Sequence, residues 1–264
     1  MDQLTPEPDF PDSFRQGMIF AHRGRFDQAS RCFEEALDQK RNSGSPYEIM
    51  VILGNLGNTY AVQEKLAEAR LCYEEVLSLQ KKASDVRTIG QTLVNLGNLS
   101  REMKQLDRAE AYYLEAADSL NNVGDEHSLG LLNSNFGLLA YDRGDFQKAV
   151  NFFENAIELH KKTGHEEGLA ASWYELGRAH LLLLDGEKAE TCFNYSSMHF
   201  HNLGNPAGEV NALRGLADVY EARNDVELAL NCMKRITEIR QTYQLIENEK
   251  DVERINRYIQ LLYR

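Results

Sequence analysis

The sequence predicts an all-α protein built as a solenoid of helical hairpins. Only five prolines occur among its 264 residues and 42% of the residues are hydrophobic, so most of the chain is free to be helical and a sizeable core can form. Apolar and small side chains recur at the spacing of amphipathic helices. One pattern also repeats every forty residues along the chain. Repetition at such a period is typical of stacked structural units.

Three columns of residues define the repeat. The first holds a small residue, at Gly17, Gly57, Gly97, Gly137, Gly177 and Ala217. The second holds alanine, at Ala29, Ala69, Ala109, Ala149, Ala189 and Ala229. The third holds a large side chain, at Phe33, Tyr73, Tyr113, Phe153, Phe193 and Met233. The six copies keep one register without an insertion, so we expect six equivalent structural units.

Each copy is predicted to contain two helices joined by a tight turn. In the second copy, Leu53, Leu56 and Tyr60 lie on one face of the first helix. A second apolar stripe follows a short break, as at Phe146 and Phe153 in the fourth copy. Glycines are expected to end several second helices with a positive φ, and these are Gly44, Gly124, Gly164 and Gly204.

The two ends of the chain differ from the repeats. Residues 1–11 are rich in proline and acidic residues, so they are predicted to form a disordered arm. Residues 12–246 hold the six repeats, and residues 247–264 are predicted to form a capping helix. One face of that helix is apolar and should cover the last repeat; its apolar positions are Val252, Ile255, Tyr258, Ile259 and Leu262.

The repeat resembles the tetratricopeptide repeat (TPR), in which a Trp or Leu precedes Leu-Gly and then Tyr, followed by Ala and an aromatic residue. Trp173, Leu176 and Gly177 occupy the first of these positions in the fifth copy. The resemblance implies a right-handed superhelix of six repeats plus a C-terminal capping helix. The forty-residue length and the phrase LGNLGNTY at 53–60 are similar to the Pins-like scaffolds and the kinesin light chains, although the C-terminal G-protein-binding motifs of the Pins-like group are absent.

Asparagines occupy the helix face opposite the packed positions, which in this architecture is the concave surface. Asn55, Asn95 and Asn135 share one column, and Asn58 and Asn98 share another. A primary amide can both donate to and accept from a peptide backbone. In related long-repeat families, asparagines at the matching position bind the backbone of an extended peptide, and the resemblance implies the same asparagine ladder here. The alternative is that these residues only decorate a solvated face.

Other candidate peptide-binding residues lie on the same predicted surface. Gln91 belongs to the third copy, and Tyr174, Arg178 and Arg214 belong to the fifth and sixth. Arg178 would contact a ligand carboxylate or pair with Glu175, and the sequence leaves both options open. The mixed charge of this surface favours an extended ligand with apolar and charged side chains.

Composition excludes several partners. The formal net charge of −12 argues against nucleic acid as the main partner. No apolar run approaches the roughly 20 residues of a membrane span, and the first residues lack the pattern of a secretory signal. No membrane insertion is therefore predicted, and a cytoplasmic location is expected.

No metal, cofactor or catalytic residue is predicted. The four cysteines share one repeat column and are separated by whole repeats, so they are expected to be buried hydrophobic residues rather than ligands; they are Cys32, Cys72, Cys192 and Cys232. The histidine pairs His160 with His165 and His199 with His201 are predicted to be surface residues, because neither pair has a nearby carboxylate or cysteine at ligand spacing. No phosphate loop, nucleophile elbow or metalloprotease motif occurs.

The sequence therefore predicts a non-enzymatic scaffold that binds an extended segment of another protein in its concave groove. Two alternatives remain. In the first, the chain self-associates as a homo-oligomer or places its own arm in the groove, with Phe10 as the anchor. In the second, it is a signalling regulator of the Rap type that binds a globular partner or a signal peptide.

Overall fold

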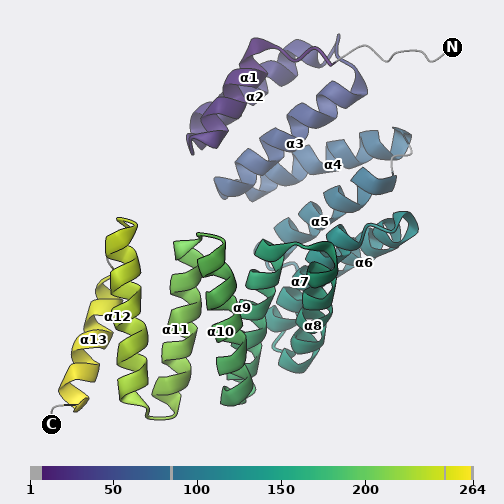
Figure 1. Ribbon diagram of the computed structural model, residues 1–264. Coiled ribbons are helices and arrows are strands. Elements are labelled where there is room, and N and C mark those ends of the chain that lie inside the picture. Colours follow the sequence, from purple (N-terminus) through teal and green to yellow (C-terminus); the bar gives the residue numbers. More distant parts are fainter. Residues whose placement is uncertain (1–7, 84–85, 247, 263–264) are drawn as a thin grey trace. The chain divides into compact units, whose positions relative to one another are not determined.

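Helices form all the regular secondary structure of residues 8–83, 86–246 and 248–262, which the computed structural model describes. Figure 1 shows these helices coloured in chain order. In chain order they are α1 (Asp12–His22), α2 (Phe26–Lys40), α3 (Pro46–Val62), α4 (Leu66–Ala83), α5 (Val86–Glu102), α6 (Leu106–Val123), α7 (Glu126–Asp142), α8 (Phe146–Thr163), α9 (Glu166–Leu182), α10 (Gly186–Asn202), α11 (Pro206–Ala222), α12 (Val226–Thr242) and α13 (Glu249–Leu262). The all-α prediction is confirmed.

The helices follow the forty-residue period of the sequence. From α3 to α11 each first helix begins forty residues after the previous one, and the same holds for the second helices from α2 to α12. The first repeat differs because α1 has 11 residues, whereas α3 has 17. A longer α1 would place Pro11 inside the helix, where its ring would clash with the preceding turn.

The chain divides into two compact units, Met1–Asp125 and Glu126–Arg264. In the first, each helix from α1 to α6 packs against the next; the second repeats this arrangement from α7 to α13. In the second unit the first helices of successive repeats also touch directly, α7 with α9 and α9 with α11. Each unit thus buries its apolar stripes by stacking hairpins.

The small-residue column gives each aromatic ring a place to pack. A Cβ added at Gly57 would lie 2.8 Å from Cε1 of Tyr73, and one at Gly97 only 2.2 Å from Cε1 of Tyr113. The same relation joins Gly137 to Phe153 at 2.5 Å. Glycine therefore lets the two helices of one repeat approach with a buried ring between them.

Three of the four predicted helix-ending glycines adopt a positive φ. The values are 67° at Gly124, 68° at Gly164 and 62° at Gly204. The prediction is wrong for Gly44, which does not adopt a positive φ. There the chain turns directly into the capping box of α3, in which the Ser45 hydroxyl accepts from the Glu48 amide and the Glu48 carboxylate accepts from the Ser45 amide.

Part of the predicted arm packs on the first unit. Residues 1–7 lie outside the described residues, but the Asp9 amide donates to Oε1 of Glu48 at 2.9 Å. The ring of Phe10 stacks on Phe14 with centroids 4.5 Å apart. At the other end, Tyr258 of α13 is buried and Ile255 packs against the last core cluster. The remaining apolar positions of that helix, Val252, Ile259 and Leu262, are exposed.

Candidate functional site

The first helices of the second unit enclose a pocket of about 300 Å³. Tyr141 enters it from α7, Tyr174 and Arg178 from α9, and Arg214 from α11. Phe193 of α10 also lines it. The structure therefore brings together three side chains that were singled out from the sequence: Tyr174, Arg178 and Arg214.

Arg178 lies among aromatic rings and one carboxylate. Its guanidinium carbon is 4.5 Å from the centroid of Tyr141 and 5.9 Å from that of Tyr174, within the range of cation–π attraction. Its Nη1 donates to Oε2 of Glu175 at 2.7 Å. Of the two roles considered for Arg178, the pairing with Glu175 is therefore present.

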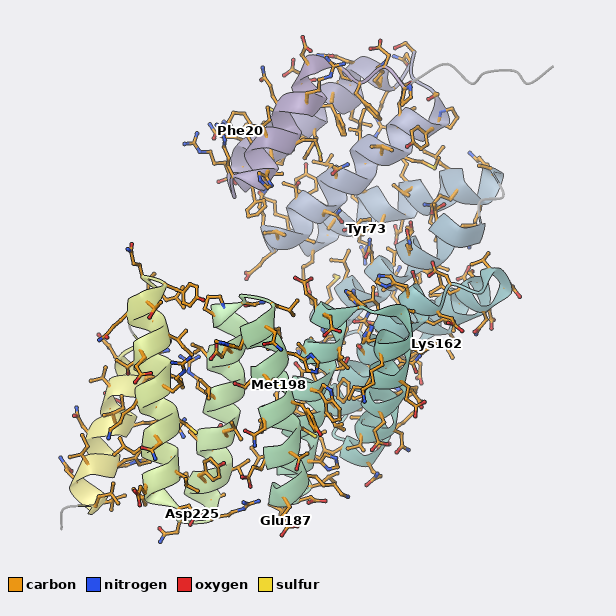
Figure 2. All side chains as sticks on the ribbon, viewed as in Figure 1. Phe20, Tyr73, Lys162, Glu187, Met198 and Asp225 are labelled. Atoms are coloured by element: carbon orange, nitrogen blue, oxygen red, sulfur yellow. The ribbon has the colours of Figure 1, made fainter. Side chains whose placement is uncertain are left out.

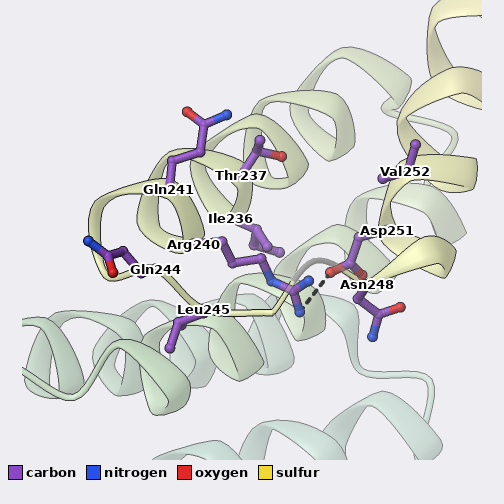
Figure 3. Close-up of a pocket in the computed structure, with 9 residues that line it drawn as sticks. All are labelled: Ile236, Thr237, Arg240, Gln241, Gln244, Leu245, Asn248, Asp251 and Val252. Atoms are coloured by element: carbon purple, nitrogen blue, oxygen red, sulfur yellow. Dashed lines mark ion pairs between the residues drawn. The ribbon is translucent and has the colours of Figure 1, made fainter.

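Arg214 holds the capping helix against the last repeat. Its Nε donates to Oδ1 of Asp251 at 3.1 Å and its Nη2 to Oδ2 at 2.8 Å. This buried carboxylate also pairs with Nη2 of Arg240 at 3.2 Å, as Figure 3 shows. One carboxylate thus joins α11, α12 and α13, so Arg214 has a structural role whatever it binds.

The pocket is amphipathic and nearly balanced in charge. Burial raises the pKa of Asp218, while the neighbouring Arg254, 2.8 Å away, opposes that rise. The three charged residues of the pocket, Arg178, Arg214 and Asp218, each have a partner of opposite sign. Aromatic walls with paired charges suit a ligand side chain that is partly apolar and partly polar.

Two of the predicted ladder asparagines are bonded to tyrosines of their own repeats. The Tyr73 hydroxyl donates to Oδ1 of Asn58 at 2.5 Å, and the Tyr113 hydroxyl donates to Oδ1 of Asn98 at 2.7 Å. The sequence carried a signal for these bonds. Among the six copies, tyrosine occurs in the large-side-chain column only in the two copies with an asparagine fifteen residues earlier.

The side chains of Asn55, Asn95 and Asn135 differ in their hydrogen bonding. Nδ2 of Asn55 donates to the Val51 carbonyl of its own helix at 2.8 Å. Asn95 and Asn135 are half-buried. Their side-chain amides make no hydrogen bond with other described residues. Gln91 is exposed. Asn55 and Asn95 belong to the first unit and Asn135 to the second, so a continuous ladder of three amides remains a prediction.

The prediction of surface histidines is wrong for His160. His160 is buried, with 1% of its surface exposed, because it fills the space above Gly130 and Gly168. Burial, together with His165 and His127, lowers its pKa to about 4. Carboxylates do lie near the second pair: Glu166 is 3.0 Å from Nδ1 of His199, and Glu209 is 3.1 Å from Nδ1 of His201.

The cysteines behave as packing residues. Cys72 and Cys192 are buried, and Cys32 and Cys232 are half-buried. Burial raises the pKa of Cys72 to about 11 and that of Cys192 to about 12, which disfavours the reactive thiolate. Among the described residues, no group of three or more His, Cys, Asp or Glu side chains could hold a metal ion.

The chain belongs to the tetratricopeptide repeat family. The Tetratricopeptide repeat family matches residues 12–82, 88–162 and 128–196, which together make up more than half of the chain. The helix-turn-helix repeats and their stacking agree with that assignment. A comparison with curated protein sequences finds no match.

Solved structures with the same fold are distant in sequence. BtubC (BKLC) from P. vanneervenii is 18% identical, with a TM-score of 0.73 over 84% of this chain and 94% of its own. The STAND protein PH0952 with a tetratricopeptide repeat sensor, from Pyrococcus horikoshii, is 17% identical, with a TM-score of 0.74 over 95% of this chain but 41% of its own. A Rap protein complexed with Competence and Sporulation Factor is 13% identical, with a TM-score of 0.68 over 95% of this chain and 74% of its own. These likenesses show the fold.

The described helices include none that is long and apolar enough to cross a lipid bilayer.

Proposed function

We propose that this chain is a non-enzymatic, cytoplasmic scaffold that binds an extended segment of a partner protein along the first helices of its repeats. The observation that carries the proposal is the pocket of the second unit, because it is lined by Tyr174, Arg178 and Arg214, all three of which the sequence predicts as peptide-binding residues. Aromatic and arginine side chains are the residue types that most often dominate binding energy at protein interfaces. The pocket is therefore the proposed anchor for one side chain of the partner.

Asn95 and Asn135 are the proposed contacts to the partner's backbone. Each is half-buried, and a half-buried amide gains free energy when it finds a hydrogen-bond partner. A peptide group offers one donor and one acceptor, which match the two ends of an asparagine amide. Asn55, Asn58 and Asn98 contribute less in this proposal because part of each amide is already bonded within the chain.

A displayed library of random linear peptides tests the proposal. The immobilised chain is used to select peptides, and the affinity of a selected peptide is measured by calorimetry for the wild type and for two variants, Arg178→Ala and the double variant Asn95→Ala with Asn135→Ala. Each variant should bind about tenfold more weakly, since the loss of one or two hydrogen bonds amounts to about 1.4 kcal/mol.

The control is the double variant Asn151→Ala with Asn231→Ala, which removes two exposed asparagines from the second helices α8 and α12. It should keep the wild-type affinity, and circular dichroism should show unchanged helicity in every variant. Equal affinity in all variants would refute the proposed contacts. Failure to select any linear peptide would refute the scaffold proposal itself.

A signalling regulator of the Rap type is the second candidate. It is favoured by the fold likeness to the Rap protein complexed with Competence and Sporulation Factor, which extends over 95% of this chain. Under this candidate, binding of a selected peptide should alter the chain's shape or its association with a globular partner. Small-angle X-ray scattering with and without the peptide separates the two candidates, since a passive scaffold should keep its scattering profile.

Self-association through the N-terminal arm has a weaker basis. Phe10, the anchor that this alternative requires, stacks on Phe14 of its own unit. Sedimentation velocity of the intact chain and of a variant lacking residues 1–11 tests the point. A concentration-dependent dimer that is lost when residues 1–11 are deleted would support self-association through the arm.

A further inference from the structure

A groove between the second helices α2 and α4 has no role in the proposed function. It encloses about 420 Å³. Buried Leu37, Leu53, Leu56 and Cys72 line it. Leu71 lies at its edge with 63% of its surface exposed. An aliphatic partner side chain placed here would bury Leu71 together with the accessible part of this apolar lining.

The sides of the groove are acidic. Glu34, Asp38, Glu68 and Glu75 line it together with one basic residue, Arg41. Nη1 of Arg41 pairs with Oε1 of Glu75 at 2.8 Å. The remaining three carboxylates face the groove without a second cation in its lining, so its electrostatic potential favours a positively charged partner.

The equivalent positions one repeat later show which charge is missing. Glu74 and Arg108 occupy the positions of Glu34 and Glu68 one repeat later. Nη2 of Arg108 is 3.1 Å from Oε1 of Glu74, and this ion pair joins α4 to α6. In the α2–α4 groove the same two positions are both carboxylates. The cation that pairs with Glu74 one repeat later therefore has no counterpart at the Glu68 position.

The carboxylates of Glu34 and Glu68 both influence the phenol of Tyr60. The Tyr60 hydroxyl donates to Oε1 of Glu34 at 2.6 Å. Burial, this hydrogen bond and the negative charges of Glu34 and Glu68 raise the pKa of Tyr60. Glu34 and Glu68 line the same groove, so one cationic side chain placed there can approach both.

We propose that the α2–α4 groove docks a partner protein segment in which a lysine or arginine stands beside an aliphatic residue. The cationic group lies between Glu34 and Glu68 and pairs with Glu34 as Arg108 pairs with Glu74 one repeat later. The aliphatic residue packs against Leu71. This surface lies on the second helices of the first unit, so it is separate from the first-helix pocket of the second unit.

The probe for this surface is a capped, fluorescein-labelled synthetic peptide of alternating leucine and lysine, measured by fluorescence anisotropy. The variant Glu68→Arg recreates the charge pair found one repeat later and should weaken binding about tenfold, which corresponds to about 1.4 kcal/mol. Leu71→Ser should also weaken binding, by several-fold. A peptide of alternating serine and lysine should bind more weakly than the leucine peptide to the wild type.

The matched control is Glu187→Arg, which changes the net charge equally on an exposed position of α10 (Figure 2). It should keep the affinity within about twofold, because Glu187 does not line the groove and interactions between exposed charges are screened at physiological salt. Equal weakening by Glu187→Arg and Glu68→Arg would show general attraction to an acidic protein and overturn the proposal. So would unchanged binding in Glu68→Arg. Glu68→Arg should not change the affinity of a library-selected peptide whose binding depends on Arg178. Failure of the groove proposal can therefore be told apart from failure of the proposed function.

Discussion

The buried hydroxyl of Tyr73 donates to Oδ1 of Asn58, and fifteen residues separate the two. The same bond, over the same separation, joins Tyr113 to Asn98. A buried phenol needs an acceptor, whereas a phenylalanine does not. In the copies with phenylalanine, the asparagine is replaced by Met18, Leu138 and Arg178. Asn58 and Asn98 each supply the acceptor that a buried tyrosine hydroxyl needs, and this accounts for both asparagines without any ligand.

Replacing Asn58 should destabilise the first unit. In Asn58→Leu the Tyr73 hydroxyl loses its acceptor, and we expect a loss of about 1–3 kcal/mol in the free energy of unfolding. Adding Tyr73→Phe should recover most of that loss, because the double variant reproduces the Leu138 and Phe153 pair of the fourth repeat. Urea unfolding monitored by circular dichroism gives the free energy of unfolding of the single and the double variant. If the double variant is no more stable than the single one, the hydrogen bond is not the reason for the asparagine.

Substitution of Gly97 should be much more harmful than substitution of Gly54. A Cβ at Gly97 would lie 2.2 Å from Cε1 of Tyr113, a fully buried ring, and such overpacking costs about 1–3 kcal/mol. A Cβ at Gly54 would meet nothing within 4 Å. There alanine should be neutral or stabilising by up to about 1 kcal/mol, because it is the better helix former. Thermal unfolding of Gly97→Ala and Gly54→Ala compares them, and similar melting temperatures would contradict the packing account.

The second unit should lose stability in mildly acidic solution. The pKa of His160 falls from 6.5 to about 4 on folding, chiefly through burial, with His165 and His127 adding to the fall. Between these two values the unfolded chain binds more protons, so stability is fully present above about pH 6.5 and declines as the pH falls towards 4. The loss should reach about 2–3 kcal/mol. Urea unfolding between pH 7 and 4 measures it, and His160→Gln should flatten the profile; an unchanged slope in that variant would assign the effect to other groups.

Cys72 and Cys192 should resist alkylation in the folded protein. Their pKa values are raised to about 11 and about 12, mainly by burial, so little thiolate exists near neutral pH. At pH 8 we expect iodoacetamide to react roughly a hundredfold more slowly than with the urea-unfolded chain. Mass spectrometry of the labelled peptides gives the rate for each cysteine. Equal rates in the two states would show that these side chains are accessible.

Removing the carboxylate of Asp251 should loosen α13. In Asp251→Asn, Arg214 and Arg240 lose the charge that both contact, and the loss of hydrogen bonds to a charged group should destabilise by about 1.5–3 kcal/mol. Hydrogen exchange over α13 should become faster. Asp12→Asn is the control, because Asp12 pairs with Arg15 at an exposed position and such pairs contribute less than about 1 kcal/mol. Equal exchange over α13 in the two variants would mean that other contacts hold this helix.

The sequence by itself determined the class of the protein. The forty-residue columns, the helix faces and the place of each hairpin follow from spacing along one helix, because local periodicity sets which side chains share a face. The bond from Tyr73 to Asn58 was also encoded, since tyrosine and asparagine occur together in the same copies.

Apart from that bond, only the tertiary structure decided which side chains meet across helices. Asp251 joins Arg214 to Arg240, His160 is enclosed by two glycines of neighbouring helices, and Glu34 shares a groove with Glu68. None of these partners is set by position within a helix. Each depends on how far one hairpin is rotated and shifted against the next, and small differences in packed volume decide that rotation.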